Sequence, residues 1–142
     1  MSEETLDTLI DGKLRLYQSR AGYRFSLDTL LLAHFVTVKR GDRIVDLGAG
    51  NGPIALLLSH LHPLASLAGL EVQPAMAERA KRSIILNRLD DRVDIVAGDL
   101  REIGSIFTPS SFDVVVSNPP FRNPGSGRIS PNREKQLARH EI

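Results

Sequence analysis

The sequence contains no cysteine, so it has neither a disulfide framework nor a thiolate metal site. Its longest apolar stretch, residues 30–38, is interrupted by His34 and Thr37 and falls well short of the roughly 20 residues that a membrane span needs. The first residues, Met-Ser-Glu-Glu, lack the basic head and apolar run of a secretory signal. We therefore expect a cytoplasmic protein without a membrane segment.

The composition is that of one globular domain with a basic C-terminal tail. Of the 142 residues, 42% are hydrophobic and 25% are charged, close to the averages for globular proteins. The net charge of +1 hides an asymmetry, because residues 1–119 hold 13 basic and 15 acidic side chains whereas residues 120–142 hold five and two. Such a tail can contact a phosphate backbone, but a solvated charged tail has the same composition.

The first 41 residues predict a small unit that packs on the rest of the chain. Residues 9–18 combine an Asp-Gly pair with an alternating second arm, as a β-hairpin does. From Ser26, a good N-cap, apolar residues recur at three- and four-residue spacing and predict an amphipathic helix that ends near Gly41. We expect residues 1–41 to cover a core formed by residues 42–142, within one structural domain.

The core alternates short strands with helices. Pro53 and Pro74 occupy first-turn positions and open helices over residues 54–61 and 75–89. The β-rich runs are residues 44–47, 67–71, 93–97 and 112–117. This alternation predicts an α/β fold with a Rossmann-like, doubly wound parallel sheet of strand order 3-2-1-4. The three consecutive valines of the last run are typical of a parallel strand covered on both faces, although the strand order makes this run an edge.

A glycine-rich turn follows the first core strand and leads directly into a helix. Its residues are Asp46, Leu47, Gly48, Ala49, Gly50, Asn51 and Gly52. Glycines allow a backbone to approach a ligand closely, and ligands bind at the carboxyl ends of strands in such sheets. The dinucleotide fingerprint needs a third glycine where this chain has Pro53, which weakens a hydride-transfer interpretation. A tight turn without a ligand is the plain alternative.

Acidic residues also mark the ends of the next two strands. Glu71, followed by Val72, closes the second strand, where an acid can accept two ribose hydroxyls. Asp99, followed by Leu100, comes directly after the third strand. Together with the glycine-rich turn, these acids favour a ligand site over a plain turn.

The fourth strand ends in a loop of unusual composition. Its residues are Asn118, Pro119, Pro120 and Phe121. An exocyclic amine or a side-chain amide is a poor nucleophile because its lone pair is delocalised. The Asn118 side-chain oxygen and the Pro119 carbonyl can accept its two N–H groups and localise that lone pair, while Phe121 can stack on the planar group. The loop predicts catalysis at a planar nitrogen, although Asn and Pro are also ordinary turn residues.

The pattern Asp-x-Gly-x-Gly-x-Gly resembles the first motif of class I S-adenosylmethionine-dependent methyltransferases. That resemblance implies S-adenosyl-L-methionine as the cofactor, with its methionine part against the residues Gly48 to Gly52. It places the methionine ammonium near Asp46 and the adenine amino group beside Asp99. We therefore predict that the glycine loop, Glu71, Val72, Asp99, Leu100 and Asn118 line a cofactor site.

Over almost the whole chain, the sequence is similar to the bacterial tRNA1(Val) adenine-N6 methyltransferases. The matching segments are Gly22 to Ser26, Asp28, Leu30 to Ala33, Asn118 to Phe121 and Ala138 to Glu141. The resemblance implies that Phe25, Ser26 and Asp28 contact the cofactor, although Ser26 also suits helix capping and Phe25 core packing. Class I methyltransferases continue well past the catalytic loop. We therefore expect an N-terminal portion, truncated after strand four, whose open edge can pair with another copy of the chain.

Three hypotheses for function follow. The first is an N-methyltransferase acting on adenine N6 in tRNA, with the basic residues from Arg122 to Arg139 on the RNA backbone. The second uses the same loop on another planar nitrogen, as a protein glutamine N5-methyltransferase or a ribosomal RNA guanine-N2 methyltransferase. The third is a binding module that holds the cofactor without turnover. We expect no metal, because the histidines show no ligand spacing.

Overall fold

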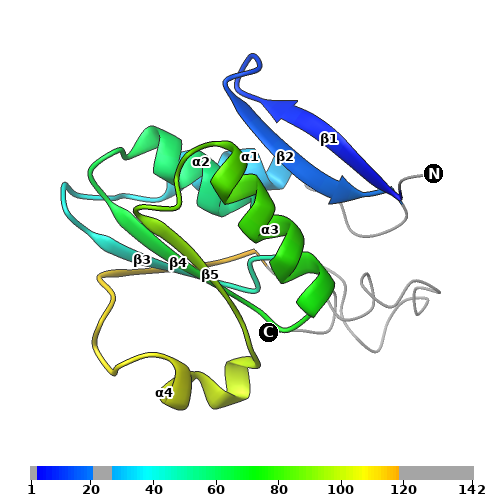
Figure 1. Cartoon of the computed structure of the whole chain (residues 1–142). Helices are drawn as coiled ribbons and strands as arrows, with labels where there is room; N and C mark the ends of the chain where they lie inside the picture. The colour runs from blue at the N-terminus through cyan, green and yellow to red at the C-terminus, as the bar shows by residue number, and fades with distance from the viewer. Residues whose placement is uncertain (1–2, 21–26, 119–142) are drawn as a thin grey trace, which may run out of the picture.

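The computed structural model describes residues 3–20 and 27–118, which form a hairpin, a parallel sheet and the helices around them (Figure 1). The elements are β1 (Glu4–Leu9), β2 (Leu14–Ser19), α1 (Leu27–Phe35), β3 (Arg43–Leu47), α2 (Pro53–Leu61), β4 (Ser66–Glu71), α3 (Pro74–Leu86), β5 (Val93–Ala97), a 3-10 turn η1 (Leu100–Glu102), α4 (Ile103–Ile106) and β6 (Val114–Ser117). No helix within the described ranges is long and apolar enough to cross a membrane.

The four core strands form one parallel sheet in the order β5-β4-β3-β6, which is the predicted order 3-2-1-4. In this register Asp46 of β3 lies between Gly69 of β4 and Val116 of β6, while Glu71 lies opposite Ala97 of β5. The strands therefore end side by side at one edge of the sheet. This arrangement confirms the predicted α/β, Rossmann-like fold.

Helices cover both faces of the sheet, with α1, α2 and α3 on one side and the short α4 on the other (Figure 1). The innermost helix is α2, which is buried from Ile54 to Ser59. A helix that is apolar all round is stable only inside a core, and each fully buried leucine contributes about 2 kcal/mol.

The N-terminal hairpin, confirmed by the structure, packs on the outer side of α3 (Figure 1). Leu9, Leu14 and Leu16 are buried and belong to the same hydrophobic cluster as Ala80 and Ile84 of α3. The burial of β2 explains this, because Leu14 and Leu16 face the core and Arg15 between them is exposed. The hairpin therefore shares the core of the sheet.

Two helices are shorter than predicted. The first, α1, ends at Phe35 and not near Gly41, because the β-branched residues at 36–38 disfavour helix. The second, α3, ends at Leu86 and not at residue 89, because Arg88 takes a left-handed φ of 58°. In both cases the apolar spacing continues past the point where the backbone leaves the helix.

The predicted cover on both faces of β6 is wrong for the described part of the chain. Val116 is 5% exposed, whereas its neighbour Val115 is 62% exposed. Successive side chains of a strand point to opposite faces, and only the face that carries Val116 is packed on helices. β6 is an edge of the described sheet, as expected, and its pairing with another copy stays a prediction.

Candidate cofactor and catalytic site

The glycine-rich turn begins as an extension of the sheet. The backbone N–H groups of Gly48 and Ala49 both donate to the carbonyl oxygen of Leu70, each at 2.9 Å. The chain then turns through positive φ angles at Gly50 (59°) and Gly52 (94°), which L side chains rarely adopt. A Cβ on Gly52 would also lie 3.2 Å from the Cβ of Ala80. The glycines are therefore required by the shape of the turn.

Glu71 locks this turn to the start of α3. Its side chain is buried, with Oε1 accepting the Gly50 N–H at 2.7 Å and Oε2 accepting the Gln73 N–H at 2.9 Å. A carboxylate is a hydrogen-bond acceptor, and these two bonds fix the Glu71 side chain at the carboxyl end of β4. The sequence predicted Glu71 as a ligand contact but not its second task of holding the loop.

Asp46 is the unusual group of the site. It is 1% exposed, and neither carboxylate oxygen has a hydrogen-bond partner within the described residues. Burial, and secondly the nearby charge of Glu71, raise the pKa of Asp46 to about 8 from its ordinary 3.8. A buried carboxylate without a partner is unfavourable, and an approaching cation relieves that cost. The site thus fits a ligand that brings a positive charge to Asp46.

Asp99 lies where the sequence predicted, directly after β5, but it already has a partner. It caps the 3-10 turn by accepting the Arg101 backbone N–H at 2.9 Å, and the Arg101 guanidinium binds the same carboxylate at 2.6 Å. These bonds lower the pKa of Asp99 to about 2. A contact from Asp99 to a ligand amino group therefore has to share the carboxylate with Arg101.

Asn118 follows β6 at the same edge of the sheet. Its side-chain Nδ2 donates to the hydroxyl of Thr29 at 3.1 Å, which leaves the amide oxygen as an acceptor. Thr29 is 1% exposed and lies on α1, 89 residues away along the chain. Thr29 was not among the predicted site residues, although it is a polar residue within the apolar run of α1.

The remaining predicted site residues divide into two sets. Asp28 lies in the first turn of α1 and is exposed, while Val72 and Leu100 are half-buried next to Glu71 and Asp99. Phe25, Ser26, Pro119, Pro120 and Phe121 lie outside the described residues. The described residues hold no cluster of three or more metal-ligating side chains.

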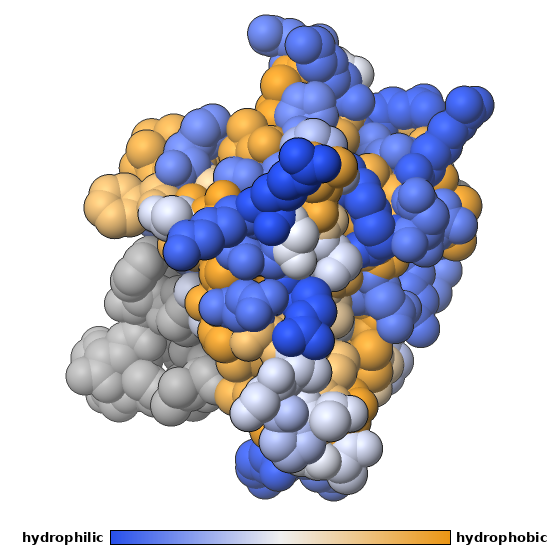
Figure 2. Space-filling model, turned by 90° about the vertical axis from the view of Figure 1, so that its left-hand side faces the viewer, coloured by the Kyte–Doolittle hydropathy of each residue, from blue (hydrophilic) through white to orange (hydrophobic). Residues whose placement is uncertain are grey.

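The opposite edge of the sheet, where the strands begin, has a different character. Figure 2 shows this side, on which hydrophilic side chains are numerous and apolar ones lie between them. A pocket there is lined by Arg43, Asp91, Arg92 and Phe112, among others. Its cations serve the fold, because Arg92 donates to the Ser59 carbonyl at 2.7 Å and Arg43 pairs with Asp113. The candidate site is therefore at the carboxyl ends of the strands.

Comparison with known proteins identifies the family of the chain. The sequence profile of the methyltransferase small domain matches residues 24–132. A tRNA1(Val) (adenine(37)-N6)-methyltransferase of Porphyromonas gingivalis is 37% identical over 99 residues, covering 68% of this chain and 38% of that protein. The protein of the same name from Bacteroides thetaiotaomicron is 31% identical, covering 88% of this chain and 51% of its own length.

Solved structures show the same fold. An RNA methyltransferase from Salinibacter ruber, crystallised with S-adenosyl-L-homocysteine, has a TM-score of 0.57 at 24% identity and covers 67% of this chain and 59% of its own. The sheet order and the fold are shared with this methyltransferase. The chain belongs to the methyltransferase small domain family, and it spans about half the length, or less, of the curated relatives described above.

Proposed function

We propose that the chain binds S-adenosyl-L-methionine and methylates the N6 amine of an adenine in tRNA. One observation carries the proposal. Asp46, which is buried and has no hydrogen-bond partner among the described residues, lies at the same edge of the sheet as Asn118, which Thr29 anchors. The names of the curated relatives support adenine in tRNA as the acceptor.

The residues present fit the cofactor. Asp46 would hold the methionine ammonium, because it is a buried carboxylate without a partner in the described structure. Gly50 and Gly52 take positive φ angles of 59° and 94°, which give the turn a tight shape after the end of β3. Glu71 would accept ribose hydroxyls, because the Gly50 and Gln73 N–H groups hold its carboxylate at the end of β4. When bound, S-adenosyl-L-methionine supplies an electrophilic methyl group.

Asn118 would act on the acceptor nitrogen. Thr29 holds the amide nitrogen of Asn118, so the amide oxygen has a fixed direction from which to accept one N–H of the adenine amine. That hydrogen bond strengthens as the amine gains positive charge, and it therefore stabilises the transition state more than the ground state. The proton leaves after the nitrogen has become cationic, so the step requires no base beforehand. Positioning of the amine by Asn118 is the contribution of the protein.

The test measures methyl transfer by the Asn118→Ala variant to total tRNA that lacks N6-methyladenosine. We expect transfer to fall by about 100-fold or more, the size of effect seen for a lost transition-state hydrogen bond, while S-adenosylmethionine still binds. The label should appear as N6-methyladenosine after nuclease digestion and chromatography. Asp94→Ala, which truncates an exposed side chain of β5, is the control and should retain transfer. Unchanged turnover in Asn118→Ala refutes the role of Asn118, and label on guanine or protein refutes the acceptor.

A further inference from the structure

One face of α3 supports three consecutive residues of the glycine-rich turn. A Cβ on Gly50 would lie 3.3 Å from Met76, and a Cβ on Gly52 would lie 3.2 Å from Ala80. Between these two contacts, Nη1 of Arg79 donates to Oδ1 of Asn51 at 3.4 Å. The helix positions 76, 79 and 80 have the spacing of neighbours on one helix face. The tip of the turn is therefore seated on α3, with Arg79 supplying its polar contact.

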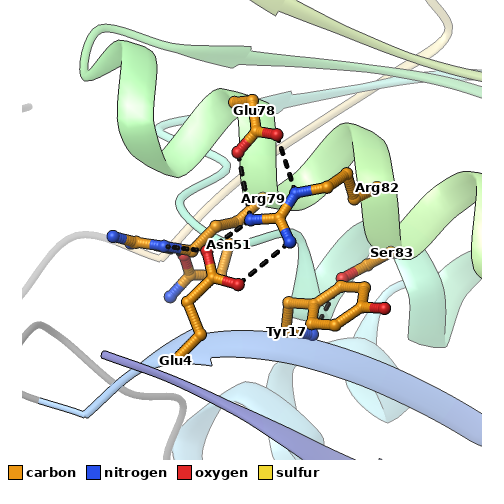
Figure 3. A network of polar contacts seen from close by, with 7 residues as sticks. All are labelled: Glu4, Tyr17, Asn51, Glu78, Arg79, Arg82 and Ser83. Carbon is orange, nitrogen blue, oxygen red and sulfur yellow. Dashed lines mark hydrogen bonds and ion pairs between the residues drawn. The ribbon is translucent and has the colours of Figure 1, made fainter. Parts of the chain in front are cut away.

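The N-terminal hairpin holds Arg79 from the other side. Nε of Arg79 donates to Glu4 of β1 at 3.2 Å, and the Arg79 side chain is only 13% exposed (Figure 3). Arg82, one turn further along α3, binds the same Glu4 carboxylate. These cations, Arg82 first, lower the pKa of Glu4. Arg79 thus connects the hairpin to the turn.

Asn51 is the residue of the glycine-rich turn that Arg79 binds. It is 4% exposed, and its side-chain oxygen accepts from α3. Asn51 lies between two glycines, so its backbone conformation depends strongly on what its side chain binds. Fixing a loop in its bound conformation raises affinity, because the ordering cost is met before the ligand arrives.

We propose that Arg79 is a positioning residue for the cofactor loop, and that the hairpin, through Glu4, sets the affinity of that loop for the methionine part of the cofactor. The inference rests on the proposed function, since it concerns the loop expected to contact S-adenosylmethionine. It assigns to β1 a role in binding although β1 lies outside the site. It also moves Asn51 from a ligand contact to a residue that holds the loop.

Arg82 provides a matched control for a role in folding alone. It binds Glu4 at 2.9 Å and Glu78 at 3.0 Å, and its guanidinium lies 4.8 Å from the centre of the Tyr17 ring (Figure 3). All three partners lie outside the glycine-rich turn. Removing Arg82 therefore weakens the attachment of the hairpin without removing the bond to Asn51.

The experiment compares Arg79→Met with Arg82→Met by calorimetry and urea unfolding of the full chain. Two ligands are titrated: S-adenosylmethionine, and 5′-methylthioadenosine, which lacks the amino-acid part. We expect Arg79→Met to weaken S-adenosylmethionine about tenfold and to leave methylthioadenosine within about twofold, because only the loop conformation is affected. Arg82→Met should lower the unfolding midpoint but keep the affinity for S-adenosylmethionine within about twofold.

Two milder variants keep the test valid if Arg79→Met does not fold. Arg79→Lys, which retains a cation beside Glu4, and Glu4→Gln, which loosens Arg79, should each weaken S-adenosylmethionine about threefold. Wild-type affinity in all the Arg79 and Glu4 variants overturns the inference, as does an equal loss for both ligands. If the wild-type chain binds neither ligand, the proposed function itself fails.

Discussion

At the scale of single residues, Asp46 links binding to stability. Its pKa is raised to about 8, so the folded protein holds a proton on Asp46 between about pH 4 and pH 8 that the unfolded chain has released. The unfolded state binds fewer protons in this window, and stability therefore falls as pH rises through it. Keeping Asp46 protonated at neutral pH costs on the order of a few kcal/mol of stability. A residue kept at such a cost has a use outside folding.

We predict that Asp46→Asn is more stable than the wild type above pH 4, with a gain that grows to about pH 8 and then levels off. Urea unfolding at several pH values measures this gain, and Asp94→Asn, which removes an exposed carboxylate of β5, is the control. The same variant should bind S-adenosylmethionine more weakly, because an amide cannot neutralise an ammonium. A gain that does not depend on pH contradicts the assignment.

A second prediction at this scale concerns Thr29, whose hydroxyl accepts from Asn118 at 3.1 Å. Thr29→Val keeps the shape of the side chain but removes the acceptor, and it leaves the Asn118 amide free to rotate. We expect methyl transfer to fall by about tenfold with little change in cofactor affinity, since one neutral hydrogen bond contributes about 1 kcal/mol. Thr29→Ser keeps the hydroxyl and should retain most activity. Equal rates for Thr29→Val and Thr29→Ser would exclude this role.

At the scale of elements, Asn87 is one of the side chains that attach the hairpin to the core. Asn87, just after α3, accepts the Arg15 N–H at 2.9 Å and donates to the Arg15 carbonyl at 2.6 Å, as a neighbouring strand would. We predict that Asn87→Ala lowers the free energy of unfolding by about 1–2 kcal/mol, because it leaves both groups of β2 without a protein partner. Hydrogen exchange should show β2 amides losing protection before those of β4. Asn87→Asp keeps the acceptor alone and should have an intermediate effect.

The elements themselves were largely predictable, for identifiable reasons. Pro53 and Pro74 fixed the starts of α2 and α3, because proline is favoured in the first turn and disfavoured later. The ends of the helices were harder to predict. The end of α3 depends on the left-handed φ of Arg88, and the residue type does not indicate that conformation. The exposed face of Val115 was missed because a run of valines has the same composition whether one face or both are covered.

At the scale of the whole molecule, strand order made the site predictable. Parallel strands end at one edge, so Asp46, Glu71, Asp99 and Asn118 could be placed together from their positions at or just after the ends of strands. The hydrogen-bond partners of the site residues within the protein could not be predicted in this way. The bonds of Asn118 to Thr29 and of Arg79 to Asn51 join segments 89 and 28 residues apart, and such pairings depend on tertiary packing.

The charge distribution of the whole chain makes a prediction for the proposed binding of tRNA and its dependence on salt. The chain has a net charge of only +1, yet residues 120–142 hold five basic and two acidic side chains. If this tail binds the tRNA backbone, affinity should fall steeply with salt, because each neutralised phosphate releases counterions. We predict that replacing the five basic tail residues by glutamine reduces the slope of log affinity against log salt by about 3.5, at roughly 0.7 per charge.

Fluorescence anisotropy with labelled, unmodified tRNA at several salt concentrations measures this slope. The control variant replaces Lys13, Lys39 and Arg40 by glutamine, three exposed cations of the described structure. Two of these lie between α1 and β3 and one in the turn of the hairpin, so neither the glycine-rich turn nor Asn118 is altered. An unchanged slope in the tail variant, or an equal reduction in the control, would mean that the RNA is held by another surface.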